Sequence, residues 1–216
     1  MAACLVLVAA ERLHLRRVRV IAKLTASAAF VALGALGLLG ALGGAGGRGD
    51  LGRLIVGGLV LGAVGDACLL VDGKRWFLAG LAAFLAGHVA YVAAMAVLVP
   101  IPAWPAAAGG WAALPAVAGA LALTWLWPRL GAMRGPVIAY VITICVMVIA
   151  AIAVARGKTL PPPNRIRLLL GASLFFVSDL SVARDRFVAR EFANKLYGLP
   201  AYYAGQLFIA WTLAGL

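Results

Sequence analysis

The sequence is poor in charge, in histidine and in cysteine, and each shortage excludes a class of protein. Charged residues make up only 12% of the 216 residues, whereas hydrophobic residues make up 65%. So little charge cannot cover a water-facing surface, which excludes a soluble globular protein. The two histidines, His14 and His88, exclude a three-histidine metal centre. The three cysteines are scattered and odd in number, so we expect each to pack as a small apolar residue.

The charge that is present is strongly basic, with 19 Lys and Arg against 7 Asp and Glu and a net charge of +12. Nucleic-acid-binding proteins gather such charge on one water-facing patch. Here the basic residues stand between long apolar runs instead. We therefore expect no nucleic-acid partner, and we interpret the basic residues as membrane anchors that contact anionic headgroups.

Repeated apolar segments predict an all-α fold, a polytopic membrane helix bundle of about eight transmembrane helices. Crossing the hydrocarbon takes about 20 apolar residues. Seven segments have suitable length: 18–42, 54–71, 76–99, 106–127, 135–155, 168–183 and 197–216. A shorter apolar start, 1–15, predicts an additional short helix; its positive charge follows the apolar run, unlike that of a cleaved signal peptide. Pro115 predicts a kink in the segment 106–127 unless neighbouring helices accommodate it.

The distribution of basic residues predicts the orientation in the membrane. The odd-numbered connections between the eight predicted helices hold twelve basic residues, and the even-numbered connections hold six. The positive-inside rule then predicts cytoplasmic odd loops with both termini outside. An abundance of Ala, Gly and Arg favours a GC-rich bacterial source, and hence a multi-pass protein of the cell inner membrane.

The chain shows internal similarity when Asp66 is aligned with Asp179. The overlay also places Gly58 on Gly171, Leu61 on Leu174, Asp72 on Asp185 and Ala86-Gly87-His88 on Ala204-Gly205-Gln206. This predicts a single integral membrane domain over 1–216 built from two parallel repeat halves, 1–100 and 101–216. Chance similarity in an Ala-rich and Gly-rich chain is the open alternative.

Two carboxylates, Asp66 and Asp179, lie within predicted membrane segments. A carboxylate in a membrane is costly and normally faces a cavity, a partner or an ion path. The overlay predicts that both lie at one depth, together with Lys23 from the second segment. The functional interpretation is a catalytic acid and base, and the structural alternative is an Asp66–Lys23 ion pair that only fastens two helices.

The remaining side chains narrow the chemistry. Gly171-Ala172-Ser173 lacks the second glycine of the G-x-S-x-G motif, which argues against a serine hydrolase. Asp66, His88 and Asp179 supply just three metal ligands, so a metal hydrolase stays an alternative to the metal-free, cofactor-free site that we favour. In a metal-free site of low dielectric, one carboxyl group stays protonated and the other ionised. Such a pair can act as general acid and general base.

Several short motifs resemble those of the YhhN-like lysoplasmalogenase family. They are Gly65-Asp66, Trp76-Phe77-Leu78, Gly87-His88-Val89-Ala90-Tyr91, Ser178-Asp179-Leu180 with Phe187, and Tyr203-Ala204-Gly205-Gln206. Lys23 also fits, although Leu24 stands where proline is expected. The resemblance implies a multi-pass ether hydrolase without a soluble cofactor. Its substrate would be a lysophospholipid, whose vinyl ether is cleaved to a fatty aldehyde and a glycerophospho-ethanolamine or glycerophosphocholine, and membrane lipids would be its other partners.

This resemblance gives the candidate residues tasks. Asp66 and Asp179 become catalytic, one donating a proton to the vinyl ether and the other directing water. The supporting candidates are Lys23, His88, Tyr91, Ser178, Tyr203 and Gln206. We expect His88 and Gln206 to orient the pair or the water, Lys23 to hold the phosphate, and Tyr91 and Tyr203 to line the cavity. For His88 the alternative is a hydrogen bond to a neighbouring carbonyl, and for Ser178 it is a hydrogen bond back to its own helix. For Tyr91, Tyr202 and Tyr203 a packing role is the alternative, and for the whole chain the alternative is a small proton-coupled membrane transporter.

Overall fold

The computed structural model describes residues 1–43 and 49–216, and within these ranges it contains helices and no strands. The basic residue Arg48, which entered the prediction of orientation, lies outside the described residues. The helices are α1 (Ala2–Arg12), α2 (Arg16–Leu38), α3 (Gly49–Cys68), α4 (Lys74–Leu98), α5 (Trp104–Ala108), α6 (Ala113–Leu130), α7 (Arg134–Arg156), α8 (Pro162–Phe187) and α9 (Phe192–Trp211). The predicted all-α fold is confirmed.

Five helical segments of the described chain are long and apolar enough to cross a membrane. They are Arg16–Leu38, Gly49–Cys68, Lys74–Leu98, Ile101–Arg156 and Pro162–Phe187. The run Ile101–Arg156 contains both α6 and α7, which are joined by a turn at Gly131, where φ is +49°. Neither α9 nor α1 is among the five, and α1, with 11 residues, reaches only about 16 Å. The fold is therefore a polytopic helix bundle of the membrane.

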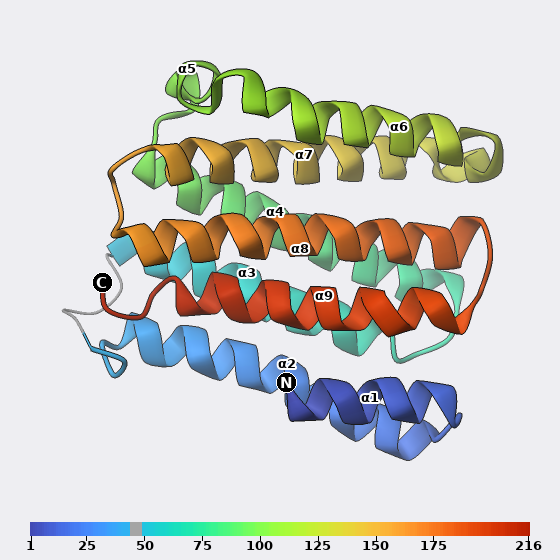
Figure 1. Cartoon of the computed structure of the whole chain (residues 1–216). Helices are drawn as coiled ribbons and strands as arrows, with labels where there is room; N and C mark the ends of the chain where they lie inside the picture. The colour runs from blue at the N-terminus through green and yellow to red at the C-terminus, as the bar shows by residue number, and fades with distance from the viewer. Residues whose placement is uncertain (44–48) are drawn as a thin grey trace.

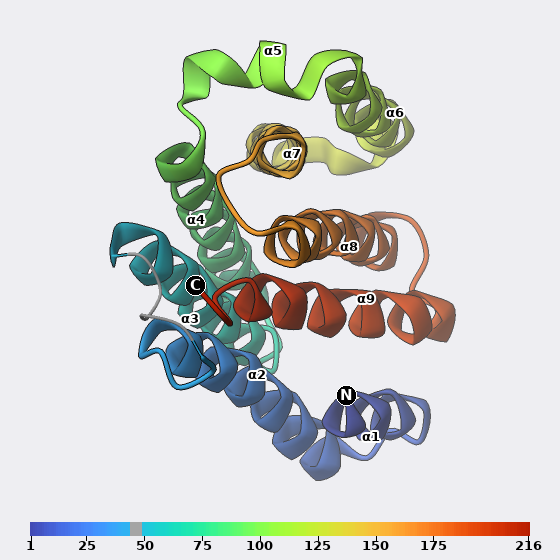
Figure 2. The same ribbon diagram turned by 60° about the vertical axis from the view of Figure 1, so that its left-hand side comes forward.

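The centre of the bundle is formed by two helical hairpins, α3 with α4 and α8 with α9 (Figure 2). Helix α2 packs against α3 and α9, and α7 packs against α4 and α8. The short α1 covers part of α2 and α9, whereas α6 lies outside α7. The connections α1–α2, α3–α4, α6–α7 and α8–α9 all lie at one end of the bundle, on the right in Figure 1. We call this end, which gathers the odd-numbered connections of the prediction, the odd end.

Glycines allow each central hairpin to close tightly. A Cβ on Gly87 of α4 would lie 3.2 Å from the carbonyl oxygen of Gly58 in α3. Likewise, a Cβ on Gly205 of α9 would lie 3.0 Å from the carbonyl oxygen of Gly171 in α8. Small residues at such crossings let helix backbones approach closely in a membrane. The two crossings use the same glycines that the sequence overlay aligns.

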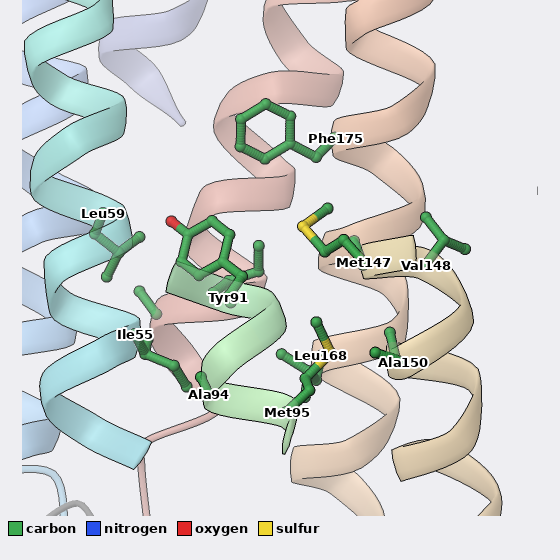
Figure 3. Close-up of a cluster of buried hydrophobic side chains, with 14 of the residues drawn as sticks. Ile55, Leu59, Tyr91, Ala94, Met95, Met147, Val148, Ala150, Leu168 and Phe175 are labelled. Atoms are coloured by element: carbon green, nitrogen blue, oxygen red, sulfur yellow. The ribbon is translucent and has the colours of Figure 1, made fainter. Parts of the chain in front are cut away.

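A buried apolar cluster fills the space between the central hairpins and α7. Figure 3 shows Tyr91 of α4 facing Leu59 and Ile55 of α3, with Met147 of α7 directed toward it. The side chains of Tyr91, Leu59 and Met147 are each at most 1% exposed. Val148 follows Met147 in α7 but is directed away from Tyr91 (Figure 3). Helix α7 therefore has one face in this cluster and another toward α6 and α8.

The predicted segment 106–127 needs correction at its start. Its first residues belong to the short helix α5, which ends at Ala108, just before Gly109, where φ is +57°. Helix α6 begins only at Ala113. Pro115 therefore stands in the first turn of α6, where a proline costs no intrahelical hydrogen bond. Pro115 is thus accommodated at the start of α6 without the loss of an intrahelical hydrogen bond.

Candidate functional site

A cavity of about 560 Å³ opens at the odd end of the bundle. Helices α2, α3, α7, α8 and α9 all contribute to its wall. Four of the residues singled out in the sequence line it: Lys23, Asp66, Ser178 and Asp179. The two carboxylates come from different hairpins, so only the folded bundle places them in one cavity.

Two donors from α2 hold the Asp66 carboxylate. Lys23 Nζ lies 3.0 Å from Oδ1 of Asp66. The Ser27 hydroxyl donates to Oδ2 of Asp66 over 2.6 Å. Lys23 and Ser27 stand one helical turn apart on the same face of α2, so both reach the same carboxylate. The ion pair offered as the structural alternative is therefore present, and its carboxylate also faces the cavity.

Asp179 has a different neighbour, His88 of α4. The Nε2 atom of His88 lies 3.5 Å from Oδ2 of Asp179, at the long limit for a hydrogen bond. Neither atom makes a well-formed hydrogen bond with any described residue. The other ring nitrogen of His88, Nδ1, lies 2.6 Å from the Phe84 carbonyl oxygen. A carbonyl only accepts hydrogen bonds, so Nδ1 carries a hydrogen and Nε2 is the nitrogen turned toward Asp179.

Aromatic rings connect the two carboxylate environments. Phe84, Phe175 and Tyr202 line the cavity and pack with ring centroids 5.2 to 6.4 Å apart. The His88 ring lies 4.4 Å from that of Phe175. This aromatic wall gives the cavity an apolar interior. In the part of the chain that the structure describes, no hydrogen bond joins Asp66 to Asp179.

Three polar side chains form a chain of hydrogen bonds beside the cavity. The Tyr91 hydroxyl donates to Gln206 Oε1 over 2.7 Å, and Gln206 Nε2 donates to the Tyr202 hydroxyl over 3.3 Å. Of these three residues, only Tyr202 lines the cavity. The Tyr203 hydroxyl instead lies 3.5 Å from the Lys23 carbonyl oxygen. The expectation that Tyr91 and Tyr203 line the cavity is therefore wrong. Tyr91 is packed under Gly58, and Tyr203 points toward α2.

Charged side chains form the rim of the cavity at the odd end. Arg184 pairs with Glu191 at 2.8 Å, and Lys195 pairs with Glu11 at 2.8 Å. The guanidinium of Arg186 lies 4.2 Å from the centre of the Phe77 ring. These contacts join the end of α8 to the starts of α9 and α4, and they join α9 to α1. The rim is therefore highly charged, and its ion pairs and cation–π contact hold the helix ends together.

Several residues of the site were not singled out in the sequence. Ser27 had a detectable signal, since it follows Lys23 by four residues in a predicted helix. Phe84, Phe175 and Tyr140, which also lines the cavity with its ring 5.2 Å from that of His88, had no such signal, because apolar and aromatic residues are common throughout the chain. Among the described residues, no group of three His, Cys, Asp or Glu side chains is placed to hold a metal ion.

The fold and the cavity define a class, a polytopic helical membrane protein with a cavity that contains two carboxylates and opens at one end of its bundle. Within that class, this chain belongs to the YhhN family, whose model matches residues 3–213. The resemblance that the motifs predicted is confirmed. No solved structure gives a significant match to the chain.

Relatives from bacteria and from cattle share about a third of the aligned residues. Lysoplasmalogenase of Mycobacterium bovis is 32% identical over 166 residues, which are 73% of this chain and 59% of that protein. Lysoplasmalogenase TMEM86A of Bos taurus is 30% identical over 158 residues, 71% of this chain and 62% of that protein. The membrane protein YhhN of Escherichia coli is 28% identical over 167 residues, 76% of this chain and 75% of that protein. The chain thus matches less than two thirds of the length of the relatives named lysoplasmalogenase.

Proposed function

We propose that this protein is a membrane-embedded hydrolase that cleaves the vinyl ether bond of lysoplasmalogens. The products are a fatty aldehyde and a glycerophospho-ethanolamine or glycerophosphocholine. The observation that carries the proposal is that Asp66 and Asp179, on separate hairpins, line one cavity beneath a charged rim. A single-chain lipid with its headgroup at the rim has its ether bond just below, at the level of the two carboxylates. The names of the M. bovis and B. taurus relatives support the same chemistry.

In this proposal the two carboxyl groups differ in protonation. Asp66 is ionised, because an ammonium group and a hydroxyl donate to its two oxygens. Asp179 carries the proton, because its Oδ2 atom is buried without a hydrogen-bond partner and no ammonium or guanidinium group is paired with it among the described residues. Asp179 is therefore the general acid and Asp66 the anionic partner.

The reaction then follows in three steps. Asp179 donates its proton to the enol-ether carbon that is not bonded to oxygen, which leaves an oxocarbenium ion at the carbon bonded to oxygen. The ionised Asp66 stabilises this cation, and water adds to it to give a hemiacetal and return a proton to Asp179. The hemiacetal then collapses by breaking the bond between its carbon and the glycerol oxygen, which releases the aldehyde and the glycerol hydroxyl.

The supporting residues take roles that match their contacts. His88 positions Asp179, since its Nδ1 is fixed on Phe84 and its Nε2 is turned to the carboxyl group. Lys23 keeps Asp66 ionised. The phosphate of the substrate is bound instead by arginines nearer the rim, such as Arg19 and Arg190, which also line the cavity.

A second set of supporting residues acts from the protein interior. Gln206 and Tyr91 hold Tyr202 in the cavity wall through their hydrogen bonds. Tyr203 packs against α2 near Lys23. Ser178 precedes Asp179 and lines the same cavity, where its hydroxyl is available to the reacting water.

The membrane arrangement completes the proposal. We propose that α1, α2, α3, α4, α6, α7, α8 and α9 form one membrane domain in the inner membrane, with α1 crossing incompletely. The odd end, which holds most of the basic residues, faces the cytoplasm, and both termini lie toward the outside. The matching glycine crossings of the two hairpins support repeat halves at 1–100 and 101–216. The cavity then receives substrate from the cytoplasmic leaflet.

The test is aldehyde release from a lysoplasmalogen by protein purified in detergent. We expect release by the unaltered chain and by Asp50→Asn, a control in an exposed carboxylate at the opposite end of α3 from Asp66. We expect no release by Asp66→Asn or Asp179→Asn while both stay folded. Full activity in either variant contradicts the proposal.

The same preparation distinguishes the alternatives. A proton-coupled transporter would release no aldehyde but would move protons in proteoliposomes in a manner that depends on both carboxylates. Loss of aldehyde release on chelation, restored by zinc, would favour a metal hydrolase over the metal-free mechanism.

A further inference from the structure

A second hollow lies on the side of the bundle, between α6, α7 and α8. Its volume is about 650 Å³. Its wall is almost entirely apolar and includes Leu114 and Ala118 of α6, Val148 and Ile152 of α7, and Leu170 and Val177 of α8. We call it the side groove. It is separate from the rim and from the carboxylates, and the proposed chemistry does not use it.

The side groove faces the lipid rather than the ends of the bundle. Leu114 is 61% exposed, and Leu170 and Val177 are each 44% exposed. These side chains border the groove on α6 and α8, whereas Val148 on its α7 wall is only 7% exposed and lies on the side of α7 away from Tyr91 (Figure 3). In a membrane, such a groove meets the aliphatic chains of lipids.

The side groove continues the reaction cavity along the same helices. Phe176 of α8 lines both hollows. On α7, Ile144 lines the cavity and Val148, one turn further, lines the groove. On α6, Ala122 lines the cavity and Ala118, again one turn away, lines the groove. Among residues 1–43 and 49–216, Phe176 alone is common to the walls of the polar cavity and the apolar groove, which adjoin along three helices.

We propose that the side groove binds the single aliphatic chain of the lysolipid substrate and that Phe176 controls its passage from the reaction cavity. This inference rests on the proposed function. When the headgroup lies at the rim and the ether bond at the carboxylates, the chain must leave the cavity on the side away from the rim. The side groove lies on that side, and its apolar wall suits a hydrocarbon chain. One groove holds one chain, which matches a lysolipid rather than a lipid with two chains.

The far end of the side groove sets a length limit. Arg156 lines the groove there, and its Nε donates to the Ala107 carbonyl oxygen of α5 over 2.9 Å. From Ile144 beside the cavity to Arg156, helix α7 rises by about 18 Å at 1.5 Å per residue, of which about 12 Å, from Val148 onward, borders the groove. The groove is thus long enough for much of an extended aliphatic chain and is bounded by a hydrogen-bonded arginine. We therefore expect the groove to select substrates by the length of their aliphatic chain.

The experiment compares the chain-length dependence of aldehyde release in three proteins. Ala118→Trp fills the groove from α6, and Val117→Trp places the same side chain at the neighbouring position, which is 56% exposed and outside the groove lining. We expect Ala118→Trp to lower kcat/KM for a long-chain lysoplasmalogen by about tenfold or more relative to a short-chain one, as in other filled apolar pockets. Val117→Trp keeps the preference of the unaltered protein. An unchanged preference in Ala118→Trp overturns the inference.

A binding measurement separates this inference from the proposed function. The probe is a lysophosphatidylethanolamine with a diazirine near the end of its chain, photolysed with the unaltered protein and with both Trp variants. We expect labelled peptides from α6 and α7 around Ala118 and Ile152, and we expect Ala118→Trp to lose the label while Val117→Trp keeps it. Labelling elsewhere, or labelling that Ala118→Trp leaves intact, overturns the inference. If the unaltered protein is labelled in the groove but releases no aldehyde, the proposed function fails and the groove assignment stands.

Discussion

Asp66 and Asp179, which the sequence overlay aligns, stand one in each central hairpin, yet their surroundings differ. Asp66 is almost fully buried, with a side chain 3% exposed, and receives an ammonium group at 3.0 Å and a hydroxyl at 2.6 Å. The Asp179 side chain is 18% exposed, and its polar neighbours among the described residues are His88, at 3.5 Å, and the Tyr140 hydroxyl. One carboxylate is thus paired closely with an ammonium group, and the other is not. The difference supports unlike tasks for the two groups, one as a fixed anion and the other as a proton donor.

The largest expected effect is on catalysis, and we expect it for substitution of either carboxylate. Asp179→Asn removes the proton donor and Asp66→Asn removes the anion, so each is expected to lower aldehyde release by about 10²- to 10⁴-fold. Initial rates in detergent, normalised to folded protein, measure the effect. A loss in only one variant would show that the other carboxylate has a purely structural role.

The two substitutions are expected to differ in their effect on the free energy of unfolding. Asp66→Asn leaves Lys23 charged in a buried position, at a cost of about 3–5 kcal/mol, whereas Asp179→Asn removes no strong partner and has a much smaller effect. Unfolding titrations in mixed micelles compare the variants. The double variant Lys23→Met with Asp66→Asn should recover much of the lost stability without recovering activity. Equal destabilisation by the two single variants contradicts the comparison.

The glycine crossings give a third comparison. A Cβ on Gly58 would lie 2.3 Å from the Tyr91 ring, and a Cβ on Gly171 would lie 2.8 Å from the Gly205 carbonyl oxygen. Both Ala variants are expected to lose about 1–3 kcal/mol of stability through overpacking. Tyr91→Leu should partly rescue Gly58→Ala, because it removes the ring. No equivalent rescue is expected for Ile209→Ala with Gly171→Ala, since the clash there includes backbone.

The smallest expected effect concerns the interior hydrogen bonds. Tyr91→Phe removes the donor to Gln206 Oε1 and should cost about 1–2 kcal/mol of stability. Aldehyde release should stay within a few-fold of the unaltered protein, because Tyr91 does not line the cavity. A loss as large as that of Asp179→Asn would move Tyr91 into the catalytic site.

Much of the bundle follows from the sequence, because apolar length and scarce charge constrain a membrane chain strongly. The same constraint identified Asp66 and Asp179, since a carboxylate inside a membrane-spanning segment is costly and is seldom found there without a functional role. It also placed Lys23 at their level, where the structure shows an ion pair with Asp66.

The details of the cavity wall could not be predicted in the same way. Tyr202 and Tyr203 are adjacent, and a helix turns by about 100° per residue, so only the packing of α9 decides which ring reaches the cavity. The start of α6 was misplaced because an apolar sequence does not show where a helix turns back. Gly109, with its positive φ, marks that point only once the backbone is known.

The central claim, that Asp179 holds a proton while Asp66 is ionised, is tested most directly by infrared difference spectroscopy. Spectra of the unaltered protein at neutral pH are compared with those of Asp179→Asn and Asp66→Asn in the carboxylic acid C=O region. The account predicts a protonated carboxyl band that disappears in Asp179→Asn and persists in Asp66→Asn. A band that persists in Asp179→Asn and disappears in Asp66→Asn would contradict it.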